Sequence, residues 1–520
     1  RLGANAEKAA AVAYTKSINS ISSAATAEVV AAIGGVESQH FIVLYLLASV
    51  AIGLYAARNV HNTADYAVAG RSLPLAVVIA TTFATWFGSE TVLGVSARFV
   101  SGNLGAVVED PFGASMCLVL VGLFFAYKLY QKNLITLGDY YRQRYGRGIE
   151  ITCSLIIMLS YLGWVAAQIT ALGLVFSLLS QGAISLTTGM VIGTSIVLVY
   201  TIYGGMWSVA LTDFVQMIVI GLGLLAIAWF AADLAGGAGK VVEYAAKEGK
   251  FQFFPTGDAK EWIFFFAAAI TMMLGSIPQQ DVFQRVMSSR DAKTAVRGPV
   301  IGGTLYFLFA LIPMFVVTAA VMVMPETAMA LLKDDPQKVL PTLVMEKMPV
   351  ILQVAFFGAL LSAIMSTASA TLLAPSTTFV ENILRNLKPG MSDQATLRAM
   401  RISVLVFTFC VLMYAITMQG TSIYELVSGA YQVPLVGAFT PLVFGLYWKR
   451  ATTQGAVLSV VLGLGTWLLF IATPALSEAF PQQLAGLLAA IGGMVVGSLA
   501  PQFVANHKGH VHHFEGSQGA

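Results

Sequence analysis

Apolar runs of about twenty residues recur along most of the chain, and this repetition constrains the fold more than any other feature. A helix needs about 20 mostly apolar residues to cross the hydrocarbon core of a bilayer. Because the runs are continuous and do not alternate with polar residues, they favour helices over the strands of a β-barrel. We therefore predict an all-α integral membrane protein with about 13 transmembrane helices, at residues 40–57, 74–98, 105–127, 149–180, 186–203, 207–232, 261–279, 298–324, 349–374, 400–418, 424–447, 452–474 and 483–503.

The composition agrees with this class of protein. Only 11% of the 520 residues are charged and 57% are hydrophobic, whereas a soluble domain has about 25% charged residues. A soluble globule of this size could not cover its surface with so few charges. The formal net charge of +3 is too small to indicate a nucleic-acid partner, so the partner that the composition predicts is the lipid bilayer.

The lysine and arginine residues predict the orientation. If the N-terminus lies outside, 18 of the 29 Lys and Arg fall on the inner side, and a short loop there, residues 128–147, is strongly basic. The positive-inside rule then predicts a multi-pass protein of the inner (plasma) membrane with a cytoplasmic C-terminus. We expect an N-terminal extracytoplasmic segment (1–39), a transmembrane domain (40–503) and a cytoplasmic tail that contains histidines (504–520).

Two of the spans are interrupted by polar residues and helix breakers. The second span carries TWFGSET at 85–91, and the seventh carries GSIPQQD at 275–281. The two spans are separated by an odd number of crossings, so they enter the membrane from opposite sides. Interrupted segments at corresponding positions of two inverted halves indicate the binding site of a secondary transporter. The alternative is that each break is a kink accommodated by neighbouring helices.

The ninth span is rich in small hydroxylated residues. Ala363, Ser366 and Thr367 share one helix face, because they stand at i, i+3 and i+4. A carbonyl and two hydroxyls on one face are uncharged hard oxygen ligands, which suit sodium. The alternative role of such small residues is close packing between membrane helices.

Few ionisable residues fall within the spans, and a charge at the membrane centre costs about 2.5–3.5 kcal/mol on insertion scales. Glu90 directly follows the first break and is the leading candidate to hold an amine or hydroxyl of a solute, the alternative being a structural role. Asp213 suits a structural or ion-coupling role better than contact with a solute. Asp281 stands four residues before Arg285, a spacing that is typical of an ion pair on one helix face.

Seven short segments carry a resemblance to a known family. They are Gly70-Arg71-Ser72-Leu73, Tyr203-Gly204-Gly205, Thr212-Asp213-Phe214-Val215-Gln216, Gln284-Arg285, Ala363-Ile364-Met365-Ser366-Thr367, Tyr447-Trp448-Lys449-Arg450 and Thr452-Thr453-Gln454-Gly455-Ala456. In these segments, and over about residues 40–500, the chain resembles the sodium:solute symporter family, whose members carry proline, pantothenate, acetate, sialic acid and sugars. The resemblance implies a leucine-transporter-type fold, in which spans two to six and seven to eleven form a five-plus-five inverted repeat with flanking helices.

The resemblance also implies the ion ligands. The main sodium site would use the backbone carbonyls of Ala84, Phe87 and Ala363 and the hydroxyls of Ser366 and Thr367. In some relatives a second ion or coupling site uses residues that match Asp213 and Ser369 here. Ala370 replaces the remaining hydroxyl ligand of that second site, so we expect one sodium ion per transport cycle.

The solute site is expected at the breaks and on the spans that face them. At the position of Trp86, proline carriers of the family have an aspartate and sugar carriers a small polar residue, so this chain departs from both. A tryptophan there could stack on a solute or fill the cavity. The string ATWFGSET at 84–91 most resembles the transport-like domains of histidine-responsive sensor kinases. With Trp86 and Glu90, the candidates for solute contact are Thr91, Trp164, Gln168, Gln279, Gln280, Tyr431 and Gln432.

Together these features predict sodium-coupled secondary active symport, by alternating access, of a small organic solute such as an amino acid or small carboxylate. One alternative is a transport-fold sensor that reports solute occupancy to a partner. Another is an accessory subunit whose N-terminal segment docks a neighbouring membrane protein. An enzyme is disfavoured, because the spans carry no nucleophile–base constellation, phosphate loop or metal-ligand cluster.

Overall fold

The computed structural model describes residues 38–507, so the predicted N-terminal segment up to residue 37 and the tail from residue 508 lie outside the described residues. Within the described part the chain forms helices and no β-strand, which confirms the all-α prediction. The helices that build the spans are α2 (Ser38–Ala56), α4 (Leu75–Trp86) with α5 (Val95–Ser101), α6 (Ala114–Leu120) with α7 (Tyr127–Tyr130), α9 (Arg147–Leu179), α10 (Leu186–Leu234), α12 (Ala259–Gly275) with α13 (Gln280–Ser288), α14 (Ala292–Val323), α17 (Val350–Phe379) with α18 (Arg385–Leu387), α19 (Asp393–Thr417), α20 (Ile423–Pro434) with α21 (Thr440–Tyr447), α22 (Thr453–Ala472) and α24 (Gln482–Leu499). Shorter helices in the connections are α3 (Thr63–Val68), α8 (Leu137–Tyr145), α11 (Ala238–Lys247), α15 (Pro325–Asp334), α16 (Val339–Lys347) and α23 (Pro474–Ala479).

The number of spans follows from three breaks. Ten helices of the described chain are long and apolar enough to cross a membrane, and two bent pairs bring the number to 12. The bent pairs are α4 with the following segment Glu90–Ser101, at 54°, and α12 with α13, at 43°. They are the two spans in which the sequence predicts interruptions.

The third break divides α10. Its 49 residues would be about 73 Å long as a straight helix, more than twice the roughly 30 Å hydrocarbon core. Gly205 has φ 49° and ψ −135°, which are not helical, so α10 is two helices that correspond to the predicted spans 186–203 and 207–232. Glycine is required there, because a Cβ would also lie 2.4 Å from the carbonyl oxygen of Tyr66. Counted this way, the described residues contain the 13 spans of the prediction.

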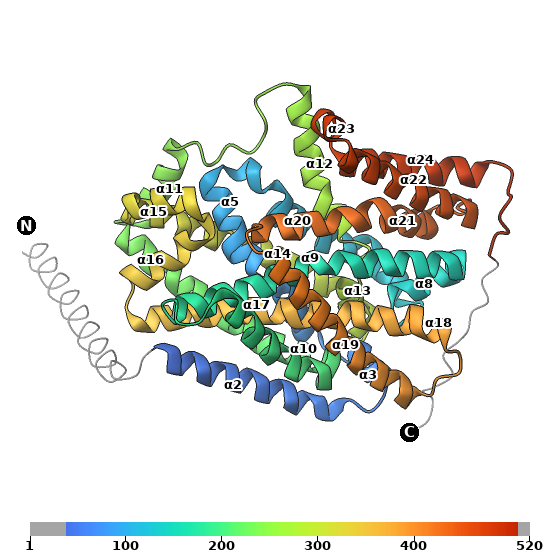
Figure 1. Cartoon of the computed structure of the whole chain (residues 1–520), viewed down its shortest axis with the longest axis horizontal. Coiled ribbons are helices and arrows are strands. Elements are labelled where there is room, and N and C mark those ends of the chain that lie inside the picture. Colours follow the sequence, from blue (N-terminus) through green and yellow to red (C-terminus); the bar gives the residue numbers. More distant parts are fainter. Residues whose placement is uncertain (1–37, 508–520) are drawn as a thin grey trace, which may run out of the picture.

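The broken spans lie against the most buried helices of the bundle. In the apolar 18-residue stretch of each span, 67% is buried for α9 and for the span that contains α17, against 28% for α2, α19 and α22. Figure 1 shows α2 along one edge of the bundle and α22 with α24 along the opposite edge. The flanking helices therefore cover a core in which α4, α9, α13, α17 and α20 meet.

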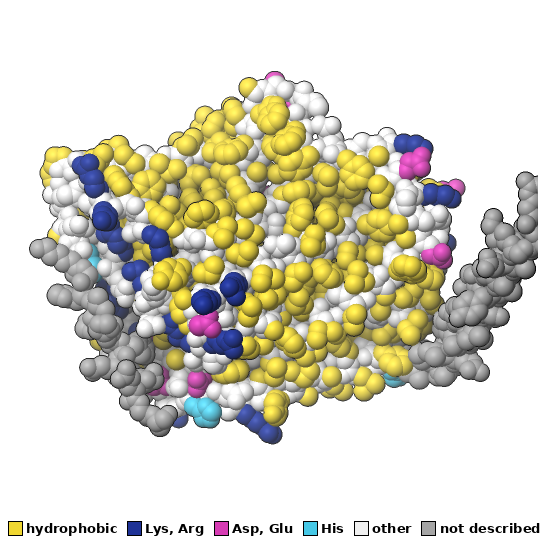
Figure 2. Space-filling view, turned by 180° about the vertical axis from the view of Figure 1, so that it is seen from behind, with side chains coloured by type: hydrophobic (Ala, Val, Ile, Leu, Met, Phe, Trp, Pro, Cys, Tyr) yellow, Lys and Arg dark blue, Asp and Glu magenta, His cyan; other side chains and the backbone are white. Residues whose placement is uncertain are grey.

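The outer surface is suited to lipid. Figure 2 shows hydrophobic side chains over most of one face, with many of the Lys and Arg side chains on this face toward one end. On α10, Trp229 is 81% exposed and Leu222 is 67% exposed. A surface this apolar is covered by lipid tails in a membrane protein. The protein is thus a multi-pass membrane protein, and the sidedness of its termini stays a prediction.

Candidate sodium and solute site

The first break frees backbone carbonyls at the end of α4. The helix ends at Trp86, and Phe87 has non-helical backbone angles (φ −85°, ψ 73°). The chain then resumes through a single π-helical turn, Glu90–Gly94. Carbonyl groups in the last turn of a helix have no partner further along it and can accept bonds from other groups.

The structure brings four of the five predicted sodium ligands together. The Ser366 hydroxyl of α17 donates to the carbonyl of Ala84, and the Thr367 hydroxyl lies 3.5 Å from the same oxygen. The Ser366 hydroxyl is also 3.2 Å from the carbonyl oxygen of Ala363. Within the described chain the carbonyl of Phe87 makes no hydrogen bond with the other four ligands. Phe87 does, however, immediately precede Gly88, which borders Thr367. The donor set is uncharged hard oxygen, which fits a sodium ion.

Gly88 separates the sodium ligands from the solute candidates. A Cβ atom at this position would lie 2.5 Å from Glu90 Oε2, 2.7 Å from Thr367 Oγ1 and 3.0 Å from Gln168 Oε1. Atoms cannot approach so closely without displacement of the surrounding side chains. The two candidate sites therefore meet at one residue that has no side chain.

Four aromatic rings gather beside the break. The Trp86 ring centroid lies 5.8 Å from that of Trp164 and 6.2 Å from that of Tyr431. Trp164 is also 5.4 Å from Tyr431 and 6.1 Å from Tyr161. All four side chains are buried, at 2% exposure or less. We call Trp86, Tyr161, Trp164 and Tyr431 the aromatic cluster.

Each tryptophan of the cluster donates its indole N–H to a carboxylate. Trp164 Nε1 donates to Glu90 Oε1 at 3.0 Å, and Gln168 Nε2 donates to Glu90 Oε2 at 2.6 Å. Trp86 Nε1 donates to Asp281 Oδ2 at 3.0 Å. The Trp86–Asp281 bond joins the first broken span directly to the second. Glu90 is thus held by an indole and an amide. The amide of Gln168 is fixed in turn, because its Oε1 accepts from the backbone N–H of Ser89 at 2.9 Å.

Thr91 and Gln279 lie next to the cluster. The Thr91 hydroxyl is 3.0 Å from the hydroxyl of Tyr306 on α14. Gln279 Nε2 donates to the hydroxyl of Ser160 at 2.9 Å, and Ser160 directly precedes Tyr161 of the cluster. The Oε1 atom of Gln279 is buried and has no hydrogen-bond partner in the described chain. Thr91 also donates to the backbone carbonyl of Trp86 at 3.4 Å, so it borders the cluster directly, whereas Gln279 borders it through Ser160.

The structure places the other two solute candidates away from the cluster. Gln280 binds the backbone at the start of α8, accepting from Leu137 N at 2.8 Å and donating to the Ile135 carbonyl at 3.3 Å. Gln432 accepts from Trp467 at 3.0 Å and from Gln482 at 3.1 Å, towards α22 and α24. Neighbouring residues on a helix point about 100° apart, so Gln432 turns outwards where Tyr431 turns inwards. Sequence position alone could not show this.

Arg285 occupies a different position from the one its spacing predicts. It is 1% exposed and donates to the backbone carbonyl of Asp281 at 3.0 Å and to the Thr85 hydroxyl at 2.8 Å. The predicted ion pair with the Asp281 carboxylate is wrong, because Trp86 and the Tyr161 hydroxyl (2.5 Å) already bind that carboxylate. Arg285 instead bridges the second break to the first.

The residues predicted for a second ion share no hydrogen bond in the described chain. Asp213 Oδ2 accepts from the hydroxyls of Thr81 at 2.5 Å and Thr85 at 3.3 Å, both on α4. The Ser369 hydroxyl instead donates to the carbonyl of Ser366 at 3.0 Å. Asp213 thus contacts the broken helix one residue from Ala84, and Thr85 links it to Arg285.

Sequence reasoning missed Asp281 and Tyr161 as members of the site. Tyr161 stands three residues before Trp164, a spacing that puts both on one face of α9. That spacing was available in the sequence. The partner of Asp281 was not, because the Trp86–Asp281 bond joins residues 195 positions apart.

Comparison with known proteins agrees with this architecture. The sequence model of the sodium:solute symporter family matches residues 66–463. The human (Homo sapiens) high affinity choline transporter 1 is 29% identical over 454 residues, which cover 82% of this chain and 76% of that protein. The high-affinity proline transporter PutP of Bacillus subtilis is 27% identical over 451 residues, which cover 85% and 93%.

Two solved structures show the fold. The substrate-bound outward-open state of a Na+-coupled sialic acid symporter has a TM-score of 0.77 at 20% identity, covering 91% of this chain and 99% of that one. MhsT in complex with L-phenylalanine has a TM-score of 0.53 at 14% identity, covering 82% and 98%. The predicted leucine-transporter-type fold is confirmed. With the family's sequence model matching most of its length, the chain belongs to the sodium:solute symporter family.

Proposed function

We propose that the chain couples sodium entry to the import of a small organic cation of the ammonium class to which choline belongs. The observation that carries the proposal is the aromatic cluster with its two carboxylates, Glu90 and Asp281. Aromatic faces attract cations by about 2 kcal/mol or more when both are desolvated, and quaternary ammonium groups are recognised in this way. Among the described residues Arg285 is the one buried Lys or Arg, and its two hydrogen bonds go to the backbone carbonyl of Asp281 and the hydroxyl of Thr85.

A cation fits this cluster better than the amino acid or small carboxylate that the sequence favours. An anionic group would face the carboxylates of Glu90 and Asp281, and like charges in a low dielectric repel strongly. The human relative is by its name a choline transporter, which supports the same solute class. The Bacillus relative is by its name a proline transporter, so proline is the solute against which the proposal is tested.

The geometry suggests how sodium and solute are coupled. Sodium bound between Ala84 and the Ser366–Thr367 pair would hold the broken α4 against α17, and Trp86 follows Ala84 by two residues. Sodium would thereby fix the ring on which the cation rests. Each ligand must then raise the affinity of the other by the same factor. We place this activity in residues 40–503, with the N-terminus outside, the C-terminus cytoplasmic and one sodium ion per cycle.

Replacing Ser366 and Thr367 together with Ala should raise the sodium concentration for half-maximal uptake by about tenfold or more. The reason is the loss of two oxygen ligands, each contact to a charged group being worth about 1.5–3 kcal/mol. Sodium-dependent uptake into liposomes measures the effect. Thr378→Ala is the matched control, because its hydroxyl bonds only the Ala374 carbonyl of its own helix, at 3.1 Å. An unchanged sodium requirement would remove both residues from the site.

Competition for uptake identifies the solute class. Purified protein in liposomes with an inward sodium gradient should take up radiolabelled choline, and other quaternary and tertiary ammonium compounds should compete with it. Proline, acetate and sialic acid in excess should leave this uptake unchanged. Sodium-driven proline uptake that ammonium compounds do not inhibit would contradict the proposed solute while leaving sodium coupling intact.

A further inference from the structure

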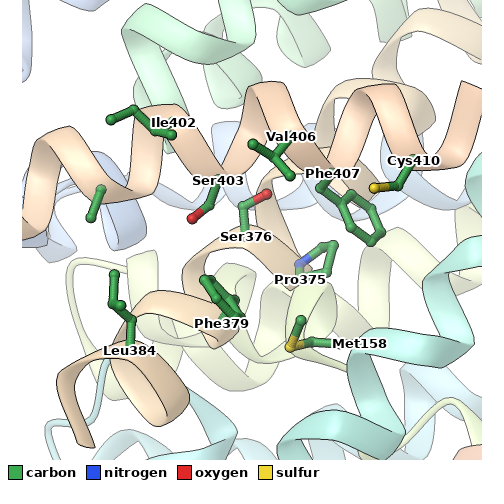
Figure 3. Close-up of a pocket in the computed structure, with 11 residues that line it drawn as sticks. Met158, Pro375, Ser376, Phe379, Leu384, Ile402, Ser403, Val406, Phe407 and Cys410 are labelled. Carbon is green, nitrogen blue, oxygen red and sulfur yellow. The ribbon is translucent and has the colours of Figure 1, made fainter. Parts of the chain in front are cut away.

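A groove of about 390 Å³ lies between three membrane-spanning helices, outside the site described above. Figure 3 shows Ile402, Ser403, Val406, Phe407 and Cys410 of α19 on one side, with Pro375 and Phe379 of α17 and Met158 of α9 across from them. The full lining is Met158, Pro375, Ser376, Phe379, Leu384, Ala399, Ile402, Ser403, Val406, Phe407 and Cys410. Apart from two serines it is apolar, so it offers little to water or a polar solute.

The length of the groove matches one leaflet of a bilayer. Its lining residues on α19 run from Ala399 to Cys410, a rise of about 16 Å along a helix. That is about half of the roughly 30 Å hydrocarbon core. Ala399 lies close to the start of α19 at Asp393, so the groove runs from one membrane surface to about the middle of the membrane. Ile402 is 62% and Val406 is 55% exposed, so lipid can enter from the side.

The end of the groove at the membrane surface carries arginines together with the carboxylates of Glu381, Asp139 and Asp393. Leu384 and Ala399 line it, and their chain neighbours are Arg385 and Arg398. The Arg385 side chain is 38% exposed and pairs with Glu381 at 2.6 Å, and Arg398 is exposed and forms no ion pair with any described residue. Arg147 also reaches this end, where its guanidinium donates to the carbonyl of Asn386.

We propose that this groove holds one acyl chain of an anionic phospholipid, whose phosphate binds Arg398, the exposed arginine that forms no ion pair with any described residue. Basic pockets between membrane helices recognise anionic head groups, and arginine matches the geometry of phosphate oxygens. The apolar lining recognises the chain, and Arg398 provides the preference for negative charge. The proposal does not depend on the identity of the transported solute.

The groove borders the helix that carries the predicted sodium ligands. Pro375 follows Thr367 by eight residues on α17, about 12 Å along the helix. Proline has no N–H, so the carbonyl of Thr371 lacks its helical hydrogen bond and α17 can bend there. A lipid that fills the space between α17 and α19 must stabilise the conformation in which the groove is open.

The test uses the full chain in nanodiscs of phosphatidylcholine with increasing phosphatidylglycerol, with native mass spectrometry to count retained lipids. The wild type should retain one phosphatidylglycerol in preference to phosphatidylcholine by roughly fivefold, the contribution of one basic side chain. Arg398→Gln should reduce that preference, whereas Lys333→Gln, an exposed lysine on α15, should not. An undiminished preference in Arg398→Gln would overturn the head-group assignment.

A second pair of variants tests the chain-binding part. Ser403→Phe should fill the groove and abolish the retained lipid, whereas Leu405→Phe, at a 49% exposed position on the same helix, should retain it. Thermal unfolding of each variant shows whether it is folded. Lipid retention in a folded Ser403→Phe protein equal to that of the wild type, or equal retention of both lipids by the wild type, would overturn the proposal.

Discussion

Replacing Arg285 with Gln is expected to lower the free energy of unfolding by about 3–5 kcal/mol, as is typical when one partner of a buried charge network is removed. Arg285 is buried between the two breaks and binds the Asp281 carbonyl and the Thr85 hydroxyl. Without it, the buried carboxylates of Asp213 and Asp281 have no buried Lys or Arg near them in the described chain. Thermal unfolding in detergent, followed by the loss of monodisperse protein, measures the effect.

The double variant Arg285→Gln with Asp213→Asn distinguishes a charge effect from a packing effect. If Arg285 compensates Asp213, removal of both charges should recover a large part of the stability that the single change loses. Arg285→Lys retains the charge, but its single ammonium group cannot bind both oxygen partners as the planar guanidinium does. Its loss of stability should therefore lie between zero and that of Arg285→Gln. Strictly additive losses in the double variant would show that the two residues are independent.

Replacing Trp86 with Leu should raise the KM for an ammonium solute by about thirtyfold, the loss of roughly 2 kcal/mol of cation–π attraction. Trp86→Phe retains an aromatic face and loses only the indole N–H to Asp281, so its effect should be smaller. Uptake kinetics in liposomes separate KM from the maximal rate. Trp229→Leu is the control for removal of a tryptophan, because that side chain is 81% exposed on the lipid-facing surface.

A neutral competitor shows whether Trp86 recognises charge. The uncharged isostere of choline, in which a tert-butyl group replaces trimethylammonium, should compete poorly with choline in the wild type. In Trp86→Leu the difference between choline and this isostere should shrink, because the cation has lost its aromatic face. If selectivity for the cation were unchanged in Trp86→Leu, Trp86 would fill space and the ammonium group would rest elsewhere.

The fold could be predicted from the sequence because its determinants are local. The apolar runs need only a length and a composition, and the breaks at 85–91 and 275–281 are marked by glycine, proline and polar residues. The division of α10 was also visible, because Gly205 separates two runs that each suffice to cross a membrane. The grouping of Ala363, Ser366 and Thr367 follows from helix geometry alone.

The solute site was less predictable because its contacts join distant segments. Residues 86 and 281, and residues 90 and 164, meet only when the spans pack. The four-residue spacing of Asp281 and Arg285 predicts a local ion pair, but tertiary contacts with Trp86 and Tyr161 take the carboxylate instead. Position along a span likewise could not distinguish Tyr431, which faces the cluster, from Gln432, which faces α22.

The most direct test of the central claim is the charge that accompanies each transported solute molecule. In liposomes with a controlled membrane potential, charge movement and radiolabelled choline uptake can be measured on the same preparation. One sodium ion and one cationic solute should carry two elementary charges per molecule, each worth about 2.3 kcal/mol per 100 mV. A single charge per molecule, or uptake that ignores the sodium gradient, would contradict sodium-coupled transport of a cation at this site.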